Sequence, residues 1–338
     1  MHICALHSVI VVASSSLHRN YSHLLDSFSN KMKFARFPAL CLLLLTPLVS
    51  AFTSTSTPRL ANVAWQSSSA LQMSTDAPTT PVTVNKFVKP PRVVRDDLPV
   101  VYVYDHCPFC VRVRVALGIK NIKFQVYFLA NDDVKTPTAL IGKKMAPIFK
   151  WPEADICMGE SLDIIALVDA DERFGPTGQI APATDRTDLK AWQKDVRDLL
   201  RNLQRPRYVA TGLLPEFQQL DGRHAFVQNH PLPGYSKDEW KGGDMELSEK
   251  LALYAECMAK DPAADIEELN RKLVELDDAL YCEYHCSPGG ISLDDVDLFS
   301  RLRSITIIQG VQWPARLRKY MDYMAALSDV PLYDEMAL

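Results

Sequence analysis

The stretch YDHCPFC, residues 104–110, places two cysteines where a predicted strand meets a predicted helix. The run that leads into it, Pro99 to Tyr104, is β-branched and aromatic, which predicts a short buried strand. The run that follows, Val111 to Leu117, predicts a helix that ends at Gly118. The two cysteines are therefore a redox pair, half of a metal site, or two unrelated thiols.

The position of the first cysteine favours the redox pair. Cys107 falls where the helix begins, so its sulfur faces unpaired backbone N–H groups and the positive end of the helix dipole. Cysteines at such helix starts have pKa values of roughly 3.5–7.5. Pro108 suits the first helical turn, and Cys110, one turn on, lies within the separation that a disulfide requires. Arg112 and Arg114 add positive charge nearby, unless both are simply solvated.

A structural zinc site is the weaker alternative. Such a site needs four ligands, usually as two close pairs. A second pair could come from Cys282, His285 and Cys286, which lie far along the chain at a helix end, where surface or half-buried thiols are the ordinary interpretation. The 8 cysteines scattered through 338 residues do not resemble a disulfide scaffold, so we expect reduced thiols and no metal.

Composition describes an ordinary globular protein. The chain is 47% apolar and 23% charged with a formal net charge of −4, and its length allows one large domain or two small ones. The slight acidity, together with the lack of a basic patch interleaved with aromatic residues, argues against a nucleic-acid partner.

Residues 1–98 are expected to be a targeting presequence and a linker rather than part of a folded domain. Ala39 to Phe52 is an apolar run shorter than the roughly 20 residues of a membrane span, and basic residues precede it, as in a signal peptide. Phe52 to Thr75 is rich in Ser and Thr and lacks Asp and Glu, as in a transit peptide. This tandem resembles the presequences of algae with complex plastids, so we expect a plastid protein, with another organelle or the endomembrane system as the alternative. Translation could start at Met1 or Met32, and Lys86 to Asp97 reads as a disordered linker.

The elements expected between the motif and residue 174 complete a small α/β domain. They are a half-buried strand from the alternation of Ile122, Phe124, Val126 and Phe128, a helix opened by Thr136 and Pro137, a hairpin of Pro147–Lys150 and Ile156–Met158, and a helix over Leu162–Val168. The order β-α-β-α-β-β-α is that of a thioredoxin-like domain, which we place at residues 99–174.

Residues 184–338 are expected to form an all-α domain. Apolar residues recur at helical spacing in two stripes, which predict a helical core rather than a cofactor box. Ser292 and Asp295 form a capping-box start for a buried helix, and Pro206 to Gly243 suggests a long surface loop. The stripes are Leu189, Trp192, Val196, Leu199 and Leu203, then Ile266, Leu269, Leu273, Leu276 and Leu280.

The motif and its surroundings resemble a known family. CPFC preceded by YDH is similar to glutaredoxins, whereas thioredoxins carry Gly-Pro between the cysteines. The segments GIKNI, NDD, TPT, API, GESLDI, LDDVDLF and QWPARL resemble the two-domain glutaredoxin 2 type, whose architecture is glutathione-transferase-like, over about Val100 to Leu338. The chain departs at Phe109, where relatives often carry Tyr, and at Leu213 to Asp261, which looks expanded.

The resemblance implies a glutathione site beside the nucleophile. Pro147 matches the family's cis-proline, which would turn the backbone of Ala146 toward the cysteinyl part of glutathione. Glu160 and Ser161 match an acidic-Ser pair at a helix start that would bind the γ-glutamyl ammonium and carboxylate. The implied glutathione-binding set is Pro108, Phe109, Lys143, Ala146, Pro147, Glu160 and Ser161, with Lys143 for the glycyl carboxylate.

The function implied is thiol–disulfide exchange. Cys107 would attack protein–glutathione mixed disulfides or small disulfides, and glutathione or Cys110 would resolve the adduct. We expect a monomer, free of the membrane when mature, with glutathione as co-substrate and glutathionylated or disulfide-containing proteins as partners. The alternatives are a glutathione-transferase-like or dehydroascorbate-reducing enzyme, and a non-enzymatic protein that binds an iron–sulfur cluster with glutathione.

Overall fold

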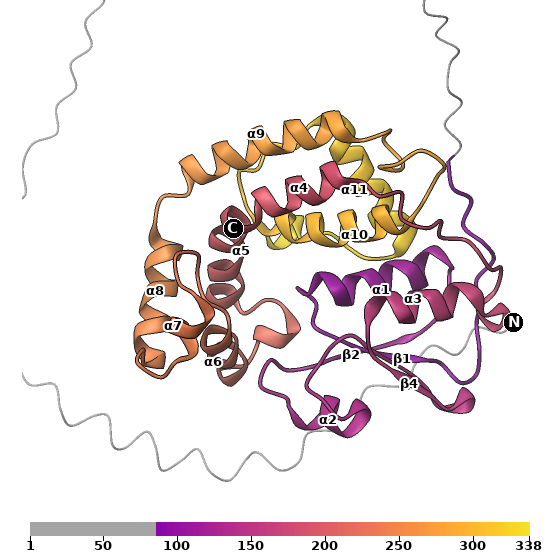
Figure 1. The fold of residues 1–338 in the computed structure, drawn as a ribbon, viewed down its shortest axis with the longest axis horizontal. Coiled ribbons are helices and arrows are strands. Elements are labelled where there is room, and N and C mark those ends of the chain that lie inside the picture. Colours follow the sequence, from indigo (N-terminus) through magenta and orange to yellow (C-terminus); the bar gives the residue numbers. More distant parts are fainter. Residues whose placement is uncertain (1–85) are drawn as a thin grey trace, which may run out of the picture. The chain divides into compact units, whose positions relative to one another are not determined.

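Residues 86–338 are described by the structure, a computed structural model, and they begin with a mixed four-stranded sheet of order β2-β1-β3-β4 (Figure 1). β1 pairs in parallel with β2 and antiparallel with β3, and β3 pairs antiparallel with β4. The elements of this part are β1 (Val100–Val103), α1 (Pro108–Ile119), β2 (Gln125–Phe128), α2 (Lys135–Ile141), β3 (Ile148–Trp151), β4 (Ile156–Met158) and α3 (Ser161–Ala170). The predicted order of a thioredoxin-like domain, including the hairpin, is confirmed.

The signal and transit segments expected before residue 86 lie outside the described residues. The linker expected at Lys86 to Asp97 is described, and it is not a free segment. Val93 donates its N–H to the Asn121 carbonyl at 2.9 Å and accepts from the Lys123 N–H at 3.0 Å, so the expectation of disorder is corrected from residue 86 onward. Among residues 86–338, no helix is both long and apolar enough to cross a membrane.

The second strand differs from its prediction. Alternation over residues 122–128 predicted one buried face, yet all four residues of β2 are exposed, and only the flanking Ile122 and Leu129 are buried. β2 is an edge strand with one neighbour, and its apolar side chains Val126, Tyr127 and Phe128 remain 38–48% exposed. The alternation of apolar and polar residues therefore predicted the strand correctly but did not predict which of its residues are buried.

Gly118 does not end α1, which continues to Ile119. A Cβ at Gly118 would lie 1.8 Å from the backbone oxygen of Ser328, at the end of α11 (Ala315–Ser328). The glycine is thus required for close approach of two helices rather than for a helix stop. The start of α2 also differs, because the Asp133 carboxylate accepts the Thr136 N–H at 2.9 Å and the helix begins at Lys135.

The rest of the described chain is helical, as predicted. Its remaining helices are α4 (Thr187–Asp195), α5 (Arg197–Thr211), α6 (Leu220–Asn229), α7 (Lys237–Lys241), α8 (Leu247–Ala259), α9 (Ala263–Ala279) and α10 (Leu293–Leu302). Both predicted stripes lie in the core, with Leu199 and Ile266 only partly buried. Ser292 and Asp295 form the predicted capping box of α10, which packs against α1. Figure 1 shows α1 and α3 between the sheet and these helices.

The prediction of a long surface loop within residues 206–243 is wrong. α5 continues through Pro206, and α6 and α7 follow it, with Phe226 and Trp240 buried in the core. Proline inside a helix leaves the carbonyl four residues earlier without its N–H donor. Here the Cys257 thiol of α8 lies 3.6 Å from that carbonyl, on Asn202, and donates to it instead. A contact distant in sequence therefore allows the helix to continue.

Candidate active site

Three segments of the small domain meet at one end of the strands of its sheet. Tyr102 of β1 is opposite Ile148 of β3, and Phe149 is opposite Met158 of β4. The residues after β1, before β3 and after β4 are therefore neighbours, which brings the cysteine motif, the Ala146–Pro147 pair and the start of α3 together. The Ala146–Pro147 peptide bond is cis, as predicted.

The two cysteines of the motif have different environments. Cys107 is the N-cap of α1 with Pro108 after it, as predicted, and is half-buried, whereas Cys110 is fully buried. The pKa of Cys107 is lowered to about 6 by a hydrogen bond from the Cys110 thiol, by the charge of His106, and by the N–H groups of Cys110 and Phe109, which outweigh burial. Burial, then the neighbouring Cys107, raises the pKa of Cys110. Only Cys107 is suited to be a thiolate at neutral pH.

His106 is held beside the nucleophile by a carboxylate from the helical domain. Oε1 of Glu216 accepts the His106 backbone N–H at 2.9 Å and lies 2.5 Å from its Nδ1. Burial disfavours charge on both residues, but their contact prevails, so the pKa of His106 is raised and that of Glu216 is lowered. The rings of Tyr208 and Phe226 lie 5.4 and 5.3 Å from the imidazole. The geometry favours an imidazolium next to Cys107.

Asp105 attaches the motif to the helical domain. Its carboxylate is 3.2 Å from Arg303 and accepts the Tyr333 hydroxyl at 2.8 Å, while Arg303 also donates to its backbone carbonyl at 2.8 Å. Burial disfavours the charged carboxylate, but the two arginines Arg303 and Arg114 lower its pKa. Arg114 pairs with Asp105, and Arg112 with Asp297, so the reading of the two arginines as solvated charges is wrong.

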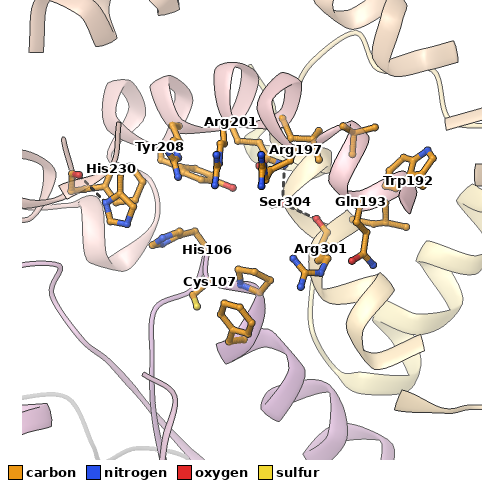
Figure 2. Close-up of a pocket in the computed structure, with 18 residues that line it drawn as sticks. His106, Cys107, Trp192, Gln193, Arg197, Arg201, Tyr208, His230, Arg301 and Ser304 are labelled. Carbon is orange, nitrogen blue, oxygen red and sulfur yellow. Dashed lines mark hydrogen bonds between the residues drawn. The ribbon is translucent and has the colours of Figure 1, made fainter. Parts of the chain in front are cut away.

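A cavity of about 450 Å³ opens beside Cys107 on the side of the helical domain (Figure 2). Pro108 and Phe109 of the motif line it, as do apolar side chains that include Trp192 and Leu200. Its lining also contains four arginines, which are Arg197, Arg201 and Arg205 of α5 and Arg301 of α10.

A second cavity of about 380 Å³ also has Cys107 in its lining. Ala146 and Lys144 line it, and His106 and Cys107 contribute to both cavities. Cys107 therefore borders two cavities, one that Ala146 also lines and one that residues of α5 also line.

The other predicted glutathione residues lie near this end of the strands but outside both linings. Ser161 is buried as the first residue of α3, and Glu160 precedes it with φ 67°. Lys143 Nζ is 3.5 Å from Glu160 Oε1, and both side chains are mostly exposed. Lys143, Pro147, Glu160 and Ser161 are absent from the lining of either cavity.

The residues considered as alternative zinc ligands, Cys282, His285 and Cys286, are buried rather than at the surface. Cys286 is fully buried, which raises its pKa, and Cys282 and His285 are each less than a tenth exposed. His285 Nδ1 is 2.7 Å from the Ser287 carbonyl. Within residues 86–338, no group of three or more His, Cys, Asp or Glu side chains is arranged to hold a metal ion.

Two features of the site were not predicted from the sequence. The Glu216–His106 contact spans 110 positions and leaves no local signal. The α5 arginines do have one, because Arg197, Arg201 and Arg205 recur at intervals of four, which places them on one helix face.

Comparison with known proteins agrees with this architecture. Residues 101–177 match the family model of the glutathione S-transferase N-terminal domain, and residues 244–337 match that of the glutaredoxin 2 C-terminal domain. Glutaredoxin 2 of Escherichia coli strain K12 is 31% identical over 238 residues, which cover 70% of this chain and 99% of that protein. The crystal structure of Salmonella typhimurium glutaredoxin 2 in complex with glutathione matches with a TM-score of 0.58 and 29% identity, over 72% of this chain and all of that one. The described part is thus a thioredoxin-like domain followed by an all-α, glutathione-transferase-like domain, and the chain belongs to the glutaredoxin 2 family.

Proposed function

We propose that this protein is a glutathione-dependent thiol–disulfide oxidoreductase that acts as a monomer, with Cys107 as nucleophile and Cys110 as resolving thiol. The observation that carries the proposal is the difference between the two thiols. Cys107 is accessible at a helix N-terminus with its pKa lowered to about 6, while Cys110 is buried with a raised pKa. A thiolate is the attacking species in disulfide exchange, and access decides which sulfur meets the substrate.

The reaction is a pair of exchanges. The Cys107 thiolate attacks the glutathionyl sulfur of a mixed disulfide, so a new S–S bond forms as the old one breaks, and the target leaves as a thiolate that takes up a proton. The thiolate of a second glutathione then attacks the adduct, which yields oxidised glutathione and restores the Cys107 thiolate. Where Cys110 attacks first, glutathione leaves, and two further glutathione molecules reduce the resulting internal disulfide.

We place the cysteinyl part of the bound glutathione in the smaller cavity, beside Ala146, with its two ends extending beyond the lining. A Salmonella relative was crystallised with glutathione, which supports a glutathione site in this chain. Ala146 lines the same cavity as Cys107, and the free N–H groups at the start of α3 suit a carboxylate. In this proposal Ser161 and Glu160 hold the γ-glutamyl end and Lys143 the glycyl carboxylate.

The proposal is tested by incubation of the purified protein with oxidised glutathione and mass spectrometry of its peptides. Cys157 is the exposed free cysteine of the described residues, so it provides an internal comparison. We expect one glutathionyl group on Cys107, or the Cys107–Cys110 disulfide that forms when Cys110 displaces it, because a lowered pKa should matter more than exposure. An adduct on Cys157 with neither product at Cys107 would refute the assignment.

We also propose that residues 32–98 direct the protein to the plastid, from their composition alone. Residues 32–98 fused to a fluorescent protein should enter the plastid of an alga with a complex plastid. Retention of the fusion in the cytosol would contradict this.

A further inference from the structure

The wall of the larger cavity carries more positive charge than a thiol exchange requires. Arg197, Arg201 and Arg205 lie one turn apart on α5, so they form a row about 12 Å long on one helix face. Arg301 joins them from α10. Figure 2 shows Arg197 and Arg201 on the helix across the cavity from Cys107.

The carboxylates around these arginines do not balance them. Arg197 and Arg201 share Asp198, at 3.4 and 3.0 Å. Arg301 is 3.0 Å from Asp297, which it shares with Arg112.

Arg205 carries the positive charge that is least neutralised by carboxylates. Its guanidinium donates to the Pro231 carbonyl, and it forms no ion pair with a carboxylate among residues 86–338. The lining of the cavity contains no Asp or Glu. A cavity with apolar walls and several arginines favours an anionic occupant, because guanidinium groups bind carboxylates with charge-assisted hydrogen bonds.

The position of the cavity shows which part of a substrate would occupy it. This step rests on the proposed function. If glutathione occupies the smaller cavity, the target half of the mixed disulfide departs from the glutathionyl sulfur next to Cys107, and the larger cavity is the neighbouring space that Cys107 also borders. A row of about 12 Å matches about four residues of an extended chain, whereas a single small carboxylate would need one arginine.

We propose that the larger cavity recognises glutathionylated proteins in which acidic residues flank the modified cysteine. The carboxylates of the flanking residues pair with the row on α5 and with Arg301, while the glutathionyl sulfur on the modified cysteine reaches Cys107. Recognition of this kind raises catalytic efficiency for acidic targets and weakens with ionic strength, because the arginines are partly exposed.

The test uses three glutathionylated peptides of equal length whose cysteine is flanked by Asp and Glu, by Ala and Ser, or by Lys. The measured quantity is kcat/KM, expressed as the ratio of the acidic to the neutral peptide. We expect acidic above neutral above basic in the wild type, with the ratio falling as salt is added. Arg201→Gln should lower the ratio about two- to five-fold, the effect of one half-exposed ion pair. Arg271→Gln, in an exposed ion-pair cluster of α9, is the matched control and should not change the ratio.

The outcomes separate this inference from the proposed function. Turnover of all three peptides at equal efficiency would overturn the inference and leave the function standing. If no peptide is turned over, the function fails, and binding of the same peptides to Cys107→Ser protein, measured by fluorescence anisotropy, decides the inference. Tighter binding of the acidic peptide supports it, and equal binding overturns it.

Discussion

The contact between Glu216 and His106 gives a direct test of how the helical domain activates the nucleophile. Glu216→Gln keeps the size of the side chain and an oxygen that can accept the His106 backbone N–H, but it removes the negative charge. Burial then disfavours the imidazolium, since its counter-ion is gone. The variant should therefore remove the positive charge beside Cys107.

The size of the effect follows from the contributions to the Cys107 pKa. A neighbouring opposite charge lowers an acid's pKa by roughly 1–3. Because the charge of Glu216 is lost as well, we expect the lower end, a rise from about 6 to about 7. The hydrogen bond from Cys110 and the helix N–H groups remain, so the pKa stays below that of a free thiol. At pH 6 the thiolate fraction should fall from about one half to about one tenth.

The assay is the rate of iodoacetamide alkylation of Cys107 as a function of pH, in a Cys157→Ser background that removes the exposed thiol. The midpoint should move to higher pH in Glu216→Gln and stay in place in Glu239→Gln, which changes an exposed residue of α7. In a His106→Gln background, Glu216→Gln should give no further rise of the midpoint, because the imidazolium that it would abolish is already absent. In the background that retains His106, an unchanged midpoint or a shift to lower pH would show that the Glu216–His106 pair does not activate Cys107.

Two further predictions concern the packing of the domains. Arg303→Met leaves Arg114 as the ion-pair partner of Asp105, beside the Tyr333 hydroxyl, and should lower the free energy of unfolding measured in urea by about 3 kcal/mol. A change below about 1 kcal/mol would mean that the buried pair contributes little. Gly118→Ala should destabilise by about 1–3 kcal/mol because the new methyl group meets Ser328, although alanine is the better helix former; a stabilised variant would contradict the contact.

Local features were readable from the sequence. The start of α1 at Pro108 depends on the strand before it and on the proline itself, and the hairpin of β3 and β4 depends on turn residues next to both strands. Cys107 and Cys110 could therefore be placed without any tertiary information.

Features that depend on distant contacts were not readable. Gly118 suggested a helix end because glycine commonly ends helices. Its actual role, close contact with Ser328, depends on a residue far along the chain. Pro206 suggested a loop because proline disfavours the interior of a helix. The Cys257 thiol that donates to the Asn202 carbonyl comes from another helix, so the sequence could not show it. Glu216 showed no relation to His106 until the two domains were packed together.

The two cysteines of the motif should have unequal roles, and turnover of a glutathionylated peptide by wild type, Cys107→Ser and Cys110→Ser measures this difference. A serine hydroxyl is not ionised at neutral pH, so Cys107→Ser should have no activity. Cys110→Ser should retain much of it, because glutathione can resolve the adduct on Cys107 and a hydroxyl can still donate to the thiolate. Equal loss of activity in both variants would show that the two thiols are equivalent and that Cys107 is not the sole nucleophile.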